Sequence, residues 1–181
     1  EDWGLPHVPR RCQGSWQAIV RVTEVRDVLA QHRYLWAAGD GGLIRWTEGA
    51  DKPKVYSVAD GLTDAAVRAL AADKQGAVWI GTAQGLCYGH SPPFRSVPTL
   101  DSVQVNAILE TTFGEIWVAT ARGLHRCDRE GHQLEWPSDT PDRLVRNSAT
   151  CLHEDESSRV WVGFASGGVA CFDSRTKDWS V

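Results

Sequence analysis

The sequence predicts an all-β fold built from four copies of one small antiparallel sheet. Three observations support this prediction: a tryptophan recurs at nearly regular intervals, a Gly-Leu step follows it at a constant distance, and a short apolar run precedes it. Nine tryptophans and 17 glycines occur in 181 residues, and a recurring Trp and Gly pattern is typical of all-β repeat proteins. The tryptophans that anchor the copies are Trp36, Trp79, Trp117 and Trp161.

Successive anchors are about 40 residues apart, which is the length of one four-stranded blade of a β-propeller. The sequence therefore predicts a β-propeller of four four-stranded antiparallel blades. The blades are expected at about residues 22–58, 64–97, 103–136 and 147–181. They either close into a four-bladed ring or form part of a larger propeller.

Each copy contains the elements of a blade in order. An apolar run such as residues 67–70 is expected to form the inner strand, and a turn rich in Asp and Gly, such as residues 73–76, reverses the chain into the Trp strand. The next hairpin ends on a Gly such as Gly85, which adopts the left-handed conformation at little cost. Leu86 then starts a third strand that faces a neighbouring blade.

A more variable fourth strand completes each predicted blade. Its Lys, Arg and Pro neighbours suit the edge of a sheet, and it is expected at residues 54–58, 94–97, 134–136 and 179–181. The anchor tryptophans are expected to be structural, buried between successive sheets rather than stacked on a ligand.

Residues 1–21 are predicted to be an N-terminal extension, in which residues 16–20 resemble a strand that could help to close the ring. The sequence contains no methionine. We therefore expect either a processed protein or, as we favour from the repeat count, a segment of a longer one.

Composition excludes several classes of partner. The formal net charge is −4 and no basic cluster occurs, so we expect no nucleic-acid binding. No apolar run approaches the roughly 18 residues of a transmembrane helix, so no membrane insertion is expected. The five cysteines lack CxxC spacing and are expected to be mostly free, buried thiols.

The second copy resembles the two-component regulator propeller repeat. The residues that carry the resemblance are Asp60-Gly61-Leu62, Val67, Asp73, Gly76, Trp79-Ile80-Gly81-Thr82 and Gly85-Leu86. The third copy matches well except for Thr111 in place of Asp, the first and fourth match less closely, and the resemblance extends over about residues 22–181. It implies a sensory module of a bacterial signalling protein, commonly periplasmic and with more than four repeats. The odd number of cysteines favours the cytoplasm, so the compartment stays open.

No catalytic motif occurs in the chain, so no catalytic residue and no cofactor are predicted. His125 with Cys127, and Cys151 with His153, each place two metal-ligand types on one face of a strand. Neither pair has a counterpart in the other copies, and we predict no metal site.

Propellers usually bind partners where their loops gather around the central channel. On this sequence that face is expected to carry arginines and amides. These groups suit an anionic or polyhydroxyl ligand or a carboxylate-bearing peptide. The predicted binding residues are Arg26, Asp40, Arg68, Gln84, Asn106, Arg122, Arg146 and Asn147, beside Thr150 and Ser166. A protein partner or small polar ligand is the first hypothesis. The alternatives are a hydrated channel without ligand, a propeller lyase or hydrolase, and an assembly module that pairs through exposed blade edges or is completed by further blades.

Overall fold

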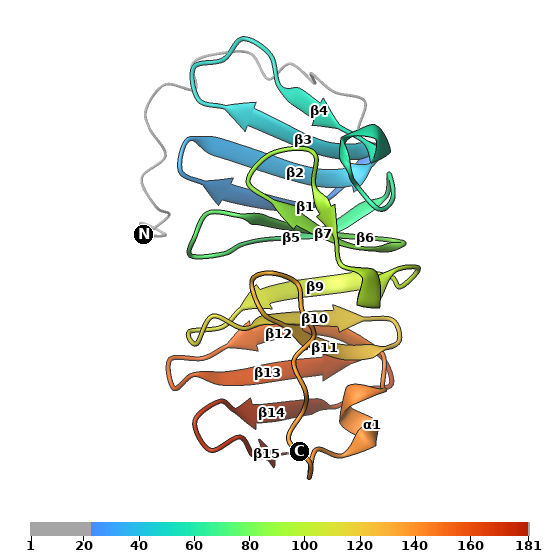
Figure 1. The fold of residues 1–181 in the computed structure, drawn as a ribbon, viewed down its shortest axis with the longest axis vertical. Helices are drawn as coiled ribbons and strands as arrows, with labels where there is room; N and C mark the ends of the chain where they lie inside the picture. The colour runs from blue at the N-terminus through green and yellow to red at the C-terminus, as the bar shows by residue number, and fades with distance from the viewer. Residues whose placement is uncertain (1–22, 181) are drawn as a thin grey trace, which may run out of the picture.

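The computed structural model describes residues 23–180, and the predicted closing strand at residues 16–20 lies outside them. The described chain is all-β, as predicted, and forms four antiparallel sheets (Figure 1). The first sheet contains β1 (Thr23–Gln31), β2 (Tyr34–Asp40), β3 (Gly42–Thr47) and β4 (Lys54–Tyr56). The second contains β5 (Val67–Ala72), β6 (Val78–Thr82), β7 (Gly85–Gly89) and β8 (Arg95–Ser96).

The third sheet contains β9 (Val105–Glu110), β10 (Ile116–Thr120) and β11 (Gly123–Cys127). The fourth contains β12 (Ala149–Glu154), β13 (Arg159–Phe164), β14 (Val169–Asp173) and β15 (Trp179–Ser180). Helix is confined to η1 (Val58–Asp60), η2 (Pro98–Leu100) and α1 (Asp142–Val145) in residues 23–180. None of the helices in this range is long and apolar enough to cross a membrane.

The outer strand expected at residues 134–136 of the third blade is reduced to a bridge between Cys127 and Gln133. The backbone N–H of Leu134 still donates to the carbonyl of Arg126 at 2.8 Å, but the chain then leaves the sheet. Trp136 packs edge-on against Trp117, with ring centroids 5.1 Å apart. Its ring therefore adds to the core between blades instead of extending the edge.

The four blades follow one another in chain order along the longest axis of the molecule (Figure 1). We call the side of a blade that carries its anchor tryptophan the front face, and the opposite side the back face. Three apolar cores form where a front face meets the back face of the next blade. The first and fourth blades lie at opposite ends of the row, so residues 23–180 form an open arc rather than a closed ring.

The anchor tryptophans follow this arrangement. Trp36, Trp79 and Trp117 are at most 1% exposed, because each front face is covered by the next blade. Trp161 is 38% exposed, which differs from the expected burial between blades. The reason is geometric, since no described blade follows the fourth.

An aspartate fixes the anchor of the second blade from within its own turn. One carboxylate oxygen of Asp73 accepts from the backbone N–H groups of Gln75 and Ala77, both at 2.9 Å. The other accepts from the indole N–H of Trp79 at 3.1 Å. The turn residue thereby satisfies a buried polar atom that the core would otherwise leave unpaired.

The other blades differ in how the indole N–H of the anchor tryptophan is bonded. Asp155 binds the indole of Trp161 at 2.9 Å, and this bond, with others from its own turn, holds the pKa of Asp155 well below its usual range. In the third blade the hydroxyl of Thr111 caps the turn while Glu115 accepts from the indole of Trp117 at 3.2 Å. In the first blade the indole nitrogen of Trp36 has no partner among residues 23–180.

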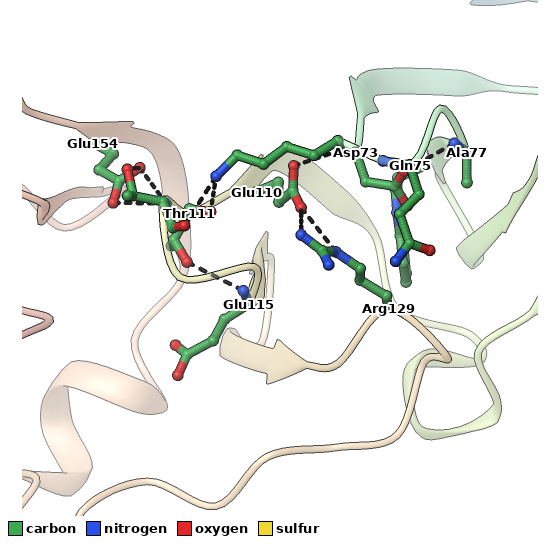
Figure 2. A network of polar contacts seen from close by, with 11 residues as sticks. Asp73, Gln75, Ala77, Glu110, Thr111, Glu115, Arg129 and Glu154 are labelled. Atoms are coloured by element: carbon green, nitrogen blue, oxygen red, sulfur yellow. Dashed lines mark hydrogen bonds and ion pairs between the residues drawn. The ribbon is translucent and has the colours of Figure 1, made fainter.

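Polar clamps join neighbouring blades beside these turns (Figure 2). Glu110, at the end of β9, accepts from the backbone N–H of Lys74 in the second blade at 2.8 Å and is held by Arg129. Glu154, at the end of β12, likewise accepts from the backbone N–H of Thr112 in the third blade. Each clamp helps to fix the orientation of two neighbouring blades whose contact is otherwise apolar.

The closest approach between blades generates a stability prediction. A Cβ added to Gly81 on the second blade would lie 2.4 Å from Cγ1 of Val105 on the third. Gly81→Ala should therefore lower the free energy of unfolding by about 1–3 kcal/mol, the usual cost of overpacking a core. Urea unfolding measures this loss.

The double variant Gly81→Ala with Val105→Ala is the matched control. It removes the contact with Cγ1 but leaves Cβ of Val105 at 2.8 Å, so it should recover part of the loss and be more stable than the sum of the two single changes predicts. Strict additivity in this double-mutant cycle would show that the two residues do not contact one another.

Candidate functional site

Four of the inner-strand residues noted in the sequence share one backbone feature. In each inner strand the register shifts at the same position, and the unpaired extra residue there is Arg26 in β1, Arg68 in β5, Asn106 in β9 and Thr150 in β12. Strand β1 has a second shift, at Glu24. Such a β-bulge bends the strand and redirects the side chain of the extra residue. The four blades therefore use the same distortion at the same position.

These four bulge residues line a common hollow of about 420 Å³, which we call the bulge groove. It extends across the inner strands at the end of the blades opposite the turn that carries Asp73. The remaining lining residues are Gln104, Ala121, Ser148 and Ala165. Two guanidinium groups, two amides and two hydroxyls thus surround one space.

The two arginines of the bulge groove differ in their partners. Arg26 pairs with Asp40 through two contacts, at 3.3 and 3.2 Å, and with Glu24 at 3.0 Å. The hydrogen bond to Asp40 raises the pKa of Arg26. Arg68 has no ion-pair partner within residues 23–180, and its Nε is buried without a hydrogen bond. Its charge is therefore the one that the described chain leaves uncompensated in this groove.

Arg45 and Arg126 also have a buried Nε without a hydrogen bond. They differ from Arg68 because each lies over aromatic rings. Arg126 is 5.0 Å from the ring centre of Trp136 and forms an ion pair with Glu115 at 2.7 Å. For these two residues the surrounding core explains the missing bond. No such stacking is present at Arg68 in the part of the chain that is described.

Two polar residues of the groove, Asn106 and Thr150, already form hydrogen bonds within the fold. Asn106 donates to the carbonyl of Ala149 at 2.7 Å, which links the third blade to the fourth, and accepts from Gln104 at 2.8 Å. Thr150 donates to the carbonyl of Gly163 on its own blade at 3.1 Å. Asn106 and Thr150 therefore shape the groove more than they offer free donors.

The structure separates the other predicted binding residues from the bulge groove. Asp40 reaches it only as the partner of Arg26. Gln84 lines a different hollow of about 510 Å³, beside Thr63 and Ser102. Arg122 is exposed at the tip of the hairpin between β10 and β11 and lines neither space.

Arg146 and Asn147 also lie elsewhere. Arg146 pairs with Asp142 of α1 at 3.5 Å, and both side chains are largely exposed. Asn147 donates to Ser166 at 2.7 Å and lines a smaller hollow of about 200 Å³ with Arg143. Of the eight predicted residues, the structure places Arg26, Arg68 and Asn106 along the groove.

Sequence reasoning missed Gln104 and Ser148, which precede the inner strands β9 and β12. Both immediately precede the apolar residue that opens the inner strand, Val105 or Ala149. A comparison of the repeats at the position just before each inner strand could have identified them. Their proximity to the bulge residues follows from the backbone distortion, which the residue pattern does not reveal.

The comparisons with known proteins agree with the architecture. The family model described as "Two component regulator propeller" matches residues 61–84, which is the copy that carries the resemblance in the sequence. A search of curated protein sequences finds no significant match.

Solved propeller structures superpose on nearly the whole chain. The extracellular domain of BT4673 from B. thetaiotaomicron, described as a one-component and as a hybrid two-component system, gives a TM-score of 0.74 at 21% identity over 87% of this chain. PorZ, a surface component of the type-IX secretion system of Porphyromonas gingivalis, gives 0.66 at 17% identity over 86%. Streptogramin B lyase gives 0.62 at 12% identity over 84% of this chain and 55% of its own.

This chain spans only 22% of the length of the BT4673 domain and 26% of PorZ. At these identities the similarities establish the β-propeller fold.

The His and Cys pairs noted in the sequence do not combine into a larger ligand set. Within residues 23–180 no group of three His, Cys, Asp or Glu side chains is arranged to hold a metal ion. Cys87, Cys127 and Cys171 are buried free thiols, and burial raises the pKa of Cys127 to about 12. His125 is half-buried on β11, and burial lowers its pKa below the ordinary value.

The lowered pKa of His125 makes stability depend on pH. The unfolded chain binds a proton at this residue near pH 6.5, before the folded chain does, so the unfolded state gains protons first as the pH falls. Stability should therefore be fully present above about pH 6.5 and decline below it. Urea unfolding at a series of pH values measures the decline, and His125→Gln should reduce it. An identical pH profile in the variant would assign the dependence to other groups.

Proposed function

We propose that this chain is a non-catalytic recognition module of a larger regulatory protein, and that it binds a carboxylate-bearing ligand at the bulge groove. The observation that carries the proposal is Arg68, a guanidinium in a groove with no acidic or aromatic partner of its own in the described chain. A carboxylate supplies both the charge and the paired acceptors that a guanidinium prefers.

The dimensions of the groove limit the ligand. A volume of about 420 Å³ lies within the range of small-molecule sites. This is enough for a single sugar acid or for one acidic side chain of a partner. Gln104 and Ser148 stand beside Arg68 as neutral donors that could fix a hydroxyl-rich ligand.

A regulatory and extracytoplasmic setting is supported by similarity alone. The BT4673 domain is extracellular and belongs to a signalling system, and PorZ is a surface component. We propose the same side of the membrane for this chain. Three of its free cysteines, Cys87, Cys127 and Cys171, are buried and therefore protected from oxidation, whereas Cys151 is exposed.

An enzymatic alternative is prompted by the similarity to streptogramin B lyase. Acid-base catalysis needs a group that can exchange a proton near neutral pH. The lining of the bulge groove in residues 23–180 includes no carboxylate, histidine, cysteine, tyrosine or lysine. This composition favours binding over catalysis as the role of the groove.

The test is calorimetric titration of the chain with glucuronate, an Asp-rich peptide and inorganic phosphate. Glucuronate or the peptide should bind, and Arg68→Ala should weaken that binding by roughly 10–100-fold, the value of one charged hydrogen-bond pair. Arg68→Lys should fall between, since lysine keeps the charge and loses the paired geometry.

Arg175→Ala is the matched control, because Arg175 is exposed in the turn after β14, at the opposite end of the blades. It removes the same charge from the chain and should leave affinity unchanged. Equal losses in both variants would indicate a non-specific charge effect, and unchanged affinity in Arg68→Ala would remove the groove as the site.

A further inference from the structure

A separate hollow lies at the end of the blades opposite the bulge groove. It has a volume of about 550 Å³ and is lined by residues of the second and third blades, beside the turn that carries Asp73. The second blade contributes that turn and the connection from β7 to β8, and the third contributes Arg129 and Glu130, which follow β11. We call this space the turn pocket. Its volume lies within the range of small-molecule sites.

Hydrogen bonds and stacking hold part of the lining in place. The hydroxyl of Tyr88 donates to the backbone carbonyl of Glu130 at 2.6 Å, which joins the two blades. The ring of Tyr88 stacks on Trp79, with ring centroids 4.5 Å apart. Arg129 donates to Glu110 at 3.0 and 2.6 Å (Figure 2). The turn pocket is therefore formed before any ligand binds.

An apolar surface makes up another part of the lining. It consists of Tyr88, which is half-buried, together with Ala77, Pro92, Pro93 and the buried Phe94. The transfer of an apolar group from water to such a surface is favourable. A ligand with an alkyl or aromatic side chain would gain this contact.

Two exposed side chains of opposite charge line the turn pocket from different blades. Arg95 belongs to β8 of the second blade, and Glu130 belongs to the third. Within residues 23–180 they form no ion pair with one another or with any other residue. By contrast, Arg129 is paired with Glu110, and the carboxylate of Asp73 already accepts three hydrogen bonds. Arg95 and Glu130 therefore remain to pair with a charged ligand.

We propose that the turn pocket binds a free amino acid with an apolar side chain. The carboxylate of the ligand pairs with Arg95, because a guanidinium matches the two acceptor oxygens of a carboxylate. The ammonium group donates to Glu130, and the side chain packs against Tyr88 and Phe94. A ligand with a single charge would leave one of the two protein charges unpaired. Because Arg95 and Glu130 belong to different blades, the bound amino acid also strengthens the contact between them.

The proposal is tested by calorimetric titration of the full chain with L-phenylalanine up to millimolar concentration. Two analogues serve as matched ligands: phenylpropionate, which lacks the ammonium group, and phenethylamine, which lacks the carboxylate. Phenylalanine should bind, and each analogue should bind at least about tenfold more weakly, since it loses one charged pair. Bound phenylalanine should also raise the midpoint of thermal unfolding, because it binds the folded state.

Variants of the two charged residues assign each end of the ligand. Arg95→Gln should weaken the binding of phenylalanine and of phenylpropionate and leave phenethylamine unchanged. Glu130→Gln should weaken the binding of phenylalanine and of phenethylamine and leave phenylpropionate unchanged. Both side chains are exposed, so the variants should fold, and circular dichroism verifies this. Arg175→Gln is the matched control, because it removes an exposed arginine at the same end of the blades, outside the lining of the turn pocket.

Three results would overturn the proposal. The first is no binding of phenylalanine at millimolar concentration. The second is an equal loss of affinity in Arg95→Gln and Arg175→Gln, which indicates a general effect of charge. The third is a loss of phenylalanine binding in Arg68→Ala, which assigns the amino acid to the bulge groove. A chain that binds phenylalanine but not glucuronate would contradict the function proposed for the bulge groove and leave the turn pocket supported.

Discussion

The packing of Trp36, Trp79 and Trp117 against the next blade is the contact on which the rest of the structure depends. An indole ring buries on the order of 200 Å², and its N–H usually finds an acceptor when it is buried. Asp73 and Glu115 supply one from positions near the turn, so the residues that reverse the chain also orient the ring. In these two blades the turn and the core are therefore coupled, whereas the first blade keeps Trp36 buried without such a bond.

The bulge groove follows from the same packing. Inner strands lie beside one another at the axis of the arc, and the extra residue in each strand cannot continue the ladder of backbone hydrogen bonds. Its side chain is directed instead to the end of the strand, where four blades place their extra residues together. Because the backbone sets this geometry, the blades can carry Arg68, Asn106 or Thr150 at one position without altering the fold.

The sequence was sufficient to predict the strands, the hairpins and three buried anchors, because these depend on local chemistry repeated at a fixed spacing. Three features depended on information that lies outside any one repeat. The exposure of Trp161 depends on whether another blade packs against it, and the inward turn of Trp136 depends on room beside Trp117. The repeat places Arg26, Arg68, Asn106 and Thr150 at one register, and the structure brings these four together. The backbone bulge at that position, on which the groove depends, is not encoded by the residue pattern. Gln84 and Arg146 were therefore grouped with Arg68 by their place in the repeat, although the structure separates them.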